Sequence, residues 1–297
     1  MPVVDVNHIY KAYGGQNALA DITFSLQPGE RLVVAGEAGA GKTLLCRLLM
    51  GMLAPTSGSV RLFGHDALLG GRICRQRTGY LPAEASLDPQ LDAAAHMRRV
   101  LSFYPRASQG RAQSLLKDLA IPPDILVQDM TPALARRLSL ALALAVQPEL
   151  LILDEPFAPY PQDEPEESAL LARVLEEARG ERTALIVTAK HVDTPPLPLS
   201  RALLLRGGQV IADGLLERLR LPCRRVTVRG GQPDAALIDR LRAWGVRTQG
   251  DQTVFFYDGA IDALLGALLS LHPQDVAIEN ACADDVLALS QAEGEMA

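Results

Sequence analysis

Eight consecutive residues combine glycines, a lysine and a hydroxyl at a spacing suited to binding a polyphosphate. They are Gly36-Glu37-Ala38-Gly39-Ala40-Gly41-Lys42-Thr43, which fits the pattern G-x-x-x-x-G-K-[ST]. Glycines let successive backbone N–H groups turn toward phosphate oxygens, where Cβ atoms would obstruct them. The pattern predicts that Lys42 binds the β- and γ-phosphates of a nucleotide such as ATP and that the Thr43 hydroxyl ligates Mg²⁺.

Two carboxylates, Asp154 and Glu155, directly follow the apolar run 150–153. Asp154 is placed to hold Mg²⁺, directly or through water, and Glu155 is the candidate catalytic base that polarises the attacking water. An Asp-Glu-Pro sequence after an apolar run can also be a helix cap. The phosphate loop in the same chain favours the catalytic interpretation.

The elements that must position these groups alternate between strands and helices. An apolar, valine-rich strand is predicted over 31–36 and a helix over 43–50, so the glycine-rich loop lies between a strand and a helix. Further strands are predicted at 150–153 and 184–188, with a helix over 166–178 between them. This alternation predicts an α/β fold with a buried parallel sheet and right-handed crossovers.

Two further regions complete the predicted organisation. The first 65 residues read as short strands and turns, and helical patterns dominate 88–147, which predicts a helical subdomain at about 84–147. A boundary is expected near Leu221-Pro222. The order strand, helix, strand, strand, helix, strand, helix then predicts a small α+β domain over 222–297, with its first helix at 234–244 and its last at 284–289.

Composition limits the function and the compartment of this chain of 297 residues. A net charge of −6 argues against a dedicated nucleic-acid binder. The four cysteines form no Cys-x-x-Cys pair, which suits a reducing compartment. Residues 1–10 do not read as a signal peptide, and the longest apolar stretch, 138–146, reaches about half of a membrane span. We therefore expect a cytoplasmic protein, with another chain crossing any membrane that it serves.

A phosphate loop, a large helical insertion and an apolar strand that ends in Asp-Glu-Pro together resemble the ABC ATPase family, whose layout residues 1 to about 219 follow. The resemblance implies a phosphate-loop NTPase core that binds ATP and Mg²⁺. It also implies partners, namely a membrane permease and a second ATPase subunit, at the inner face of the cell membrane. Tyr13 lies where the family stacks an aromatic ring on adenine; a partly exposed strand tyrosine is the alternative. Residues 222–297 resemble the accessory domain of daunorubicin-type exporters, and 283–289 look like its last helix.

The segment equivalent to the family's signature, Leu-Ser-Gly-Gly-Gln, is altered. In its place stand Thr131, Pro132, Ala133 and Leu134. Threonine followed by proline suits an N-cap and a first helical position, so the helix and its dipole are expected to survive. Proline has no N–H to offer a γ-phosphate, and the new Cβ atoms restrict close approach. This half-site is expected to hold ATP weakly or to be inactive.

Three more positions depart from what the resemblance implies. Ala83 replaces the glutamine after Tyr-Leu-Pro, although Glu84 could partly substitute for it. Ala189 replaces the switch histidine, and His191 could serve only if the backbone there is rearranged. Pro161 replaces the aspartate of the loop after Asp-Glu-Pro. Four departures on one communicating surface suggest that part of the catalytic cycle is lost while nucleotide binding is kept.

These residues leave three functions open. The first is the ATP-binding subunit of an ABC transporter of export type, an ATPase with reduced activity, for which Lys42 and Glu155 argue. The second is a nucleotide-binding structural subunit that hydrolyses little and pairs with a competent second ATPase. The altered positions Pro132, Ala83, Ala189 and Pro161 favour this second function, and with it an asymmetric heterodimer over a homodimer. The third is a soluble ABC ATPase without a permease.

Overall fold

The computed structural model describes residues 1–104, 107–157, 165–192, 195–216, 218–219, 223–231, 233, 235–269, 271, 273–281 and 285. The chain divides into two compact units, Met1–Gly214 and Leu215–Ala297. The predicted boundary at Leu221-Pro222 lies outside the described residues and stays a prediction. Across the described residues, no helix is both long enough and apolar enough to cross a membrane.

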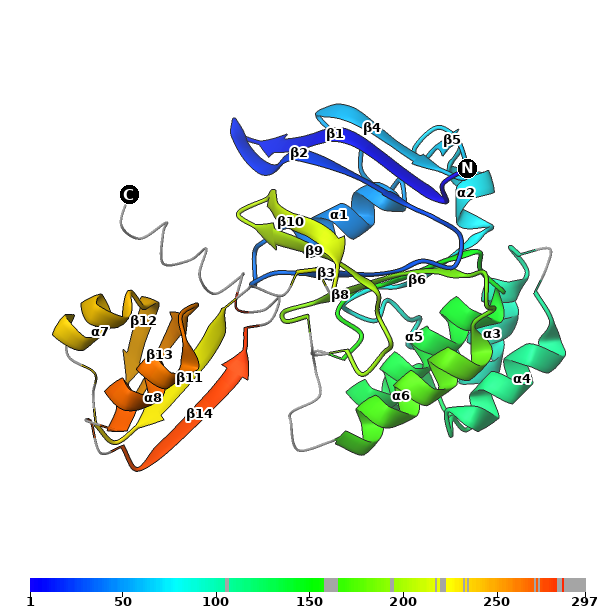
Figure 1. Ribbon diagram of the computed structural model, residues 1–297. Coiled ribbons are helices and arrows are strands. Elements are labelled where there is room, and N and C mark those ends of the chain that lie inside the picture. Colours follow the sequence, from blue (N-terminus) through cyan, green and yellow to red (C-terminus); the bar gives the residue numbers. More distant parts are fainter. Residues whose placement is uncertain are drawn as a thin grey trace. The chain divides into compact units, whose positions relative to one another are not determined.

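The first unit contains a six-stranded sheet in the order β10-β9-β3-β8-β7-β6 (Figure 1). The strands are β3 (Arg31–Ala35), β6 (Thr78–Leu81), β7 (Leu150–Leu153), β8 (Ala184–Ala189), β9 (Arg201–Arg206) and β10 (Gln209–Leu215). Strand β3 pairs in parallel with β8 and β9, and β7 pairs in parallel with β6 and β8. All residues of β7 and β8 are buried, as expected for strands that are covered on both faces. The predicted parallel α/β core is confirmed.

This strand order brings distant chain segments to one edge of the sheet. Because parallel strands end on the same side, the loops that follow β3, β6, β7 and β8 lie at the same edge. They begin at Gly36, Pro82, Asp154 and Lys190, respectively. The phosphate loop and the two carboxylates are therefore brought together by the sheet itself.

A second sheet, in the order β2-β1-β4-β5, forms the N-terminal part of this unit. Its strands are β1 (Val4–Tyr13), β2 (Gln16–Leu26), β4 (Ser57–Leu62) and β5 (His65–Asp66). The expectation of short strands was wrong for β1 and β2, which form one long antiparallel hairpin that turns at Gly14 and Gly15. Both glycines have positive φ, which the tight turn requires. Strand β1 also pairs with β4 on the edge that faces away from β2. These partners make β1 longer than its own residue pattern indicates.

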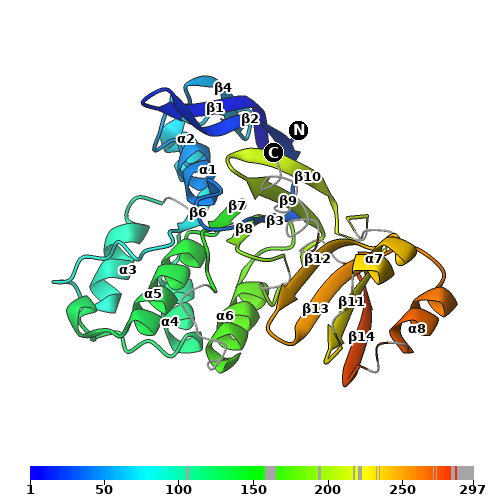
Figure 2. The ribbon, with the colours of Figure 1, turned by 90° about the vertical axis from the view of Figure 1, so that its left-hand side faces the viewer.

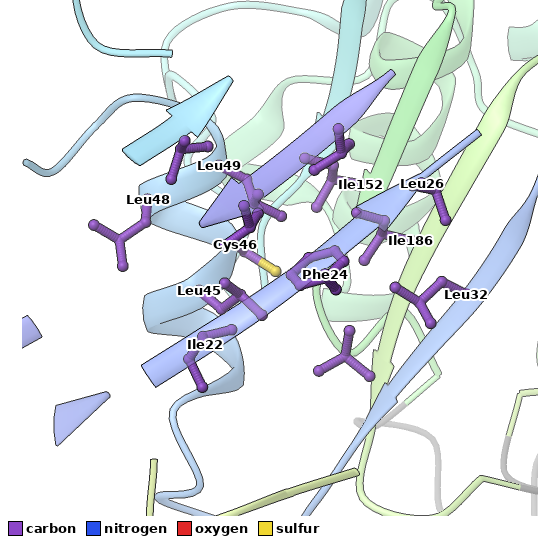
Figure 3. Close-up of a cluster of buried hydrophobic side chains, with 14 of the residues drawn as sticks. Ile22, Phe24, Leu26, Leu32, Leu45, Cys46, Leu48, Leu49, Ile152 and Ile186 are labelled. Atoms are coloured by element: carbon purple, nitrogen blue, oxygen red, sulfur yellow. The ribbon is translucent and has the colours of Figure 1, made fainter. Parts of the chain in front are cut away.

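Helix α1 (Lys42–Leu49) lies between the two sheets (Figures 1 and 2). Its apolar side chains Leu45, Cys46, Leu48 and Leu49 contact buried residues of both, among them Phe24 and Ile186 (Figure 3). This cluster anchors the helix that begins directly at the phosphate loop.

The remaining helical elements of the first unit are α2 (Gly71–Arg75), α3 (Ala93–Leu101), α4 (Gln109–Asp118), the 3-10 turn η1 (Val127–Asp129), α5 (Pro132–Ala145) and α6 (Pro165–Ala178). The helices α3, α4, α5 and α6 lie on the side of the six-stranded sheet that faces away from α1 (Figure 2). Helices α3, α4 and α5 contact one another and form the predicted helical insertion. Helix α5 also contacts β6, so the insertion adjoins the core sheet.

In its described residues, the second unit contains a four-stranded antiparallel sheet in the order β12-β13-β11-β14 and the helices α7 and α8. Its elements are β11 (Arg224–Arg229), α7 (Ala235–Leu241), β12 (Trp244–Gln249), β13 (Gln252–Tyr257), α8 (Ile261–Leu269) and β14 (Asp275–Asn280). The predicted helix 234–244 is too long, because Arg242 has a positive φ and Trp244 already pairs in β12. The predicted last helix, 284–289, lies outside the described residues except for Asp285, whose backbone is helical.

Candidate nucleotide-binding site

The phosphate loop needs its glycines for two different reasons. A Cβ on Gly36 would lie 2.3 Å from the backbone oxygen of Leu205, so the neighbouring strand leaves room only for glycine. Gly39 and Gly41 have φ values of +83° and +98°, a backbone region that side chains disfavour. The loop therefore exposes backbone N–H groups at the start of α1, where the helix dipole favours an anion.

Lys42, the first residue of α1, is 5% exposed and directs its ammonium back into the loop. Its Nζ donates to the carbonyl oxygens of Gly36 at 2.6 Å and Glu37 at 3.0 Å. The same Nζ forms an ion pair with Glu155 Oε1 at 3.1 Å. The cation and the candidate base, which are far apart in the sequence, are thus in direct contact.

Asp154 is fully buried at the end of β7, and Thr188 at the end of β8 holds it. The Thr188 hydroxyl donates to Asp154 Oδ1 at 2.7 Å and accepts from the Glu155 N–H at 2.8 Å. Burial raises the pKa of the Asp154 carboxyl, and the hydroxyls of Thr188 and Thr43 act against that rise. Sequence reasoning missed Thr188 as a site residue. The available signal was a hydroxyl at the carboxyl end of a predicted buried strand.

The residues assigned to Mg²⁺ fit such an ion. Asp154 Oδ2 is buried, and no hydrogen-bond partner for it exists among the described residues. A buried carboxylate oxygen is costly unless it meets a donor or a cation. Within the described part of the chain, no three His, Cys, Asp or Glu side chains form a metal site of their own. Mg²⁺ bound by Asp154 and Thr43 would therefore need further oxygen ligands, which a nucleotide can supply.

Glu155 occupies a left-handed backbone conformation, with φ of +48°. For a residue other than glycine this costs about 1–3 kcal/mol, and it persists only where the surroundings hold it. The N–H is held by Thr188, and the carbonyl oxygen accepts from Arg136 Nη1 at 3.0 Å. The side chain, 32% exposed, is then directed at Lys42.

A pocket of about 570 Å³ opens over the phosphate loop. It is lined by the loop, the start of α1, the candidate base and two neighbouring segments: Asn17, Ala18, Ala38, Gly39, Gly41, Lys42, Thr43, Leu44, Glu155 and Gly207. Tyr13 is not among these residues. Tyr13 is 53% exposed, with Lys11 Nζ 5.0 Å from the centroid of its ring. The adenine-stacking role of Tyr13 stays a prediction.

The helix expected at the altered signature segment is present. Thr131 is the N-cap of α5, its Oγ1 accepts from the Leu134 N–H at 3.2 Å, and Pro132 is the first helical residue. The predicted cap is confirmed. Thr131 and Pro132 are exposed, and Ala133 is partly exposed, so this helix end is accessible. Its weak or lost affinity for ATP stays a prediction.

The structure places the other altered positions around the phosphate loop and α5. Ala189 is buried at the end of β8, and its carbonyl accepts from the Gly36 N–H at 3.2 Å. The carbonyl of Ala83 accepts from Arg136 Nη2 at 2.6 Å. Glu84 and His191 are exposed. Pro161 lies outside the described residues.

A parallel sheet with a glycine-rich loop, a buried lysine and a buried aspartate at one edge defines a phosphate-loop NTPase fold. Residues 19–158 match the family model described as "ABC transporter". This segment therefore corresponds to an ABC transporter ATP-binding domain.

Curated relatives cover most of the chain at low identity. Over 263 residues the chain is 27% identical to the "Nod factor export ATP-binding protein I" of Burkholderia orbicola (strain AU 1054), covering 86% of this chain and 85% of the relative. Over 264 residues it is 29% identical to the protein of the same name from Neorhizobium galegae, covering 86% and 75% of the two chains.

Solved structures share the fold of the first unit. The "Structure of ATP binding subunit of ABC transporter" superposes with a TM-score of 0.67 at 22% identity and covers 73% of this chain and 91% of that chain. A dimeric ATP-binding cassette in a post-hydrolysis state, bound to ADP and Pi, superposes with a TM-score of 0.62 at 21% identity. It covers 72% of this chain and 98% of that chain. At these identities the likeness shows the fold alone, which is that of the ABC ATPase core.

Proposed function

We propose that this chain is the ATP-binding subunit of an ABC exporter. The observation that carries the proposal is the phosphate loop with its buried Lys42 ammonium 3.1 Å from the Glu155 carboxylate. The names of the relatives, which concern Nod factor export, support the export class. They do not identify this chain's cargo, because a cargo is selected by the permease that lines its path.

Each site residue receives a role in this proposal. The amides at the end of the loop, after Ala40, bind the phosphates together with Lys42 and stabilise the charge of the transferred group, and Thr43 with Asp154 holds Mg²⁺. Bound Mg²⁺ supplies positive charge to the β- and γ-phosphates. A γ-phosphate that contacts Lys42 replaces Glu155 as its counterion, which frees the Glu155 carboxylate to accept a proton from the attacking water.

The proposed partners are a membrane permease at the inner face of the membrane and a second ABC ATPase subunit. In a head-to-tail dimer, the N-terminus of α5 meets the nucleotide bound by the partner subunit. ATP binding then closes the dimer, and hydrolysis or release opens it. The exposed Thr131-Pro132 end of α5, which lacks the N–H of a glycine, favours a heterodimer whose second subunit carries an intact signature.

A second candidate function is a nucleotide-binding structural subunit with little hydrolysis. Ala189 favours it, because a methyl group beside the phosphate loop neither donates a proton nor carries charge. Residues 222–297 are proposed as the accessory domain of the daunorubicin type in either case. The antiparallel sheet β12-β13-β11-β14 with the helices α7 and α8 is compatible with that role.

The deciding experiment is steady-state ATPase of the purified chain and of the intact membrane complex, with its subunits identified by mass spectrometry. We expect MgATP binding but slow turnover by the chain alone, and faster turnover in a complex with a second ATPase. Brisk turnover without any partner contradicts the asymmetric dimer. Absence of MgATP binding by the well-folded chain contradicts both candidate functions.

A further inference from the structure

Arg136 joins three elements of the first unit through two backbone hydrogen bonds. It lies in the second turn of α5 and is 8% exposed. Its Nη1 donates to the carbonyl of Glu155, after β7, and its Nη2 donates to the carbonyl of Ala83, after β6. We propose that Arg136 is a positioning residue that holds the Glu155 backbone and couples it to α5. This inference rests on the proposed function of the site.

The bond to Glu155 falls on a backbone that needs support. The left-handed conformation of Glu155, with φ of +48°, is disfavoured for a residue with a Cβ. Thr188 holds the N–H of this residue and Arg136 holds its carbonyl. The carboxylate of Glu155 therefore reaches Lys42 from a backbone that is restrained on both sides, and α5 supplies one of the restraints.

The geometry of a guanidinium suits this task. Its N–H donors are fixed in one plane, so a shift of α5 displaces both bonds together. Lysine would offer a single ammonium and could not reproduce the fork. The bond at position 83 uses the main-chain carbonyl, so it does not depend on the glutamine side chain that Ala83 lacks. The link from α5 to the loop after β6 therefore persists despite that replacement.

The neighbouring Arg137 shows that this pattern is particular to Arg136. Arg137 forms a bidentate ion pair with the Glu167 carboxylate on α6 and donates to the carbonyl of Leu119 at 3.2 Å. Those contacts join α5 to α6 and to the end of α4. Arg136 is directed at the edge of the core sheet where the nucleotide site lies.

The consequence is coupling between the N-terminus of α5 and the backbone of Glu155. Helix α5 is capped by Thr131, which faces the partner's nucleotide in the proposed dimer. Displacement of α5 by that nucleotide is transmitted through Arg136 to the backbone of Glu155. Occupancy of one half-site thereby changes the position of the base in the other.

The test is hydrogen exchange, followed by mass spectrometry on the full chain, in peptides that cover 79–86 and 150–157. Arg136→Met and Arg136→Lys are compared with wild type, and Arg137→Met serves as the matched control. The free chain is measured first, then the chain with MgATP and with MgADP. Calorimetry with MgATP and thermal unfolding are recorded for each variant.

In the free chain, we expect Arg136→Met to raise the hydrogen-exchange rate of the Glu155 amide, in peptide 150–157, and of peptide 79–86. The increase should be about tenfold beyond what any global loss of stability accounts for. Arg136→Lys should give an intermediate effect, because it keeps the positive charge and a single donor nitrogen in place of the guanidinium fork. Arg137→Met should lower the melting temperature without this selective effect. MgATP should protect 79–86 in wild type and not in Arg136→Met, while the phosphate loop is protected in both.

Unchanged exchange at Glu155 and 79–86 in Arg136→Met overturns the inference. An equal effect of Arg137→Met also overturns it, because the contacts would then be merely structural. Wild-type chain that does not bind MgATP overturns the proposed function instead, since the comparison without nucleotide is independent of binding.

Discussion

The Lys42 ammonium and the Glu155 carboxylate form a 3.1 Å ion pair across the mouth of the phosphate loop. The ammonium is also held by the carbonyl oxygens of Gly36 and Glu37. In the proposed function, a γ-phosphate competes with Glu155 for this cation. Nucleotide binding and release of the base are then the same event.

Lys42→Ala should weaken MgATP binding by about 10- to 100-fold, because a charge-assisted hydrogen bond contributes about 1.5–3 kcal/mol. Isothermal titration calorimetry measures this directly. Lys117→Ala, which removes an exposed lysine of α4, is the control and should bind as wild type does. Equal affinity in Lys42→Ala and wild type contradicts the assigned site.

Glu155→Gln, made in this chain alone, should reduce ATP turnover of the assembled complex by about 100-fold or more, since a positioned base contributes about 10²–10⁴. MgATP affinity should be retained, because Lys42 loses a competing carboxylate. Steady-state ATPase of the complex is the measurement. Nearly unchanged turnover would mean that Ala189 has already silenced this site.

Thr131→Ala should lower the free energy of unfolding by about 1 kcal/mol, because it removes the N-cap of α5. Urea denaturation of the variant provides the comparison. Thr131→Ser keeps an acceptor oxygen and should stay close to wild type. A loss as large in the serine variant shows that the cap is not the cause.

The free energy of unfolding should fall as the pH drops below about 6.5, the ordinary pKa of histidine. Burial lowers the pKa of His96, Arg99 acts in the same direction and Asp88 opposes both. His96 Nε2 accepts from the Asp88 N–H at 2.9 Å, so the folded state needs a neutral ring. The unfolded state then binds more protons in acid, which favours unfolding.

Urea denaturation between pH 5 and about 7.5 measures this dependence. His96→Gln should flatten it, whereas His65→Gln, at an exposed position, should leave the slope as it is. If both variants keep the wild-type slope, His96 does not contribute to the acid sensitivity.

A chain that ends near Leu221 should fold and bind MgATP, because the phosphate loop and both sheets around α1 lie within residues 1–215. Circular dichroism and calorimetry test this expectation. A soluble, folded truncation that does not bind MgATP shows that residues 222–297 contribute to the site.

Local residue types predicted much of the core. The valine-rich run 31–35, the glycine-rich loop and the helix from Lys42 appear as expected. The strand before Asp154 and the cap at Thr131 also appear as expected. Each depends on neighbours within a few positions, through buried-strand composition, glycine backbone freedom or a side-chain cap. The lengths of β1 and β2 were missed, because their partners, not their own pattern, extend them.

The sequence by itself determined the chemistry available to this protein: a phosphate loop, a lysine, a threonine hydroxyl and two adjacent carboxylates. Only the tertiary structure decided that Thr188 links Asp154 to Glu155 and that Arg136 holds the carbonyls of Ala83 and Glu155. The strand order β3-β8-β7-β6 sets these contacts between segments that are distant along the chain. The left-handed backbone of Glu155 likewise depends on them, since a residue with a Cβ adopts it only when surrounding groups hold it in place.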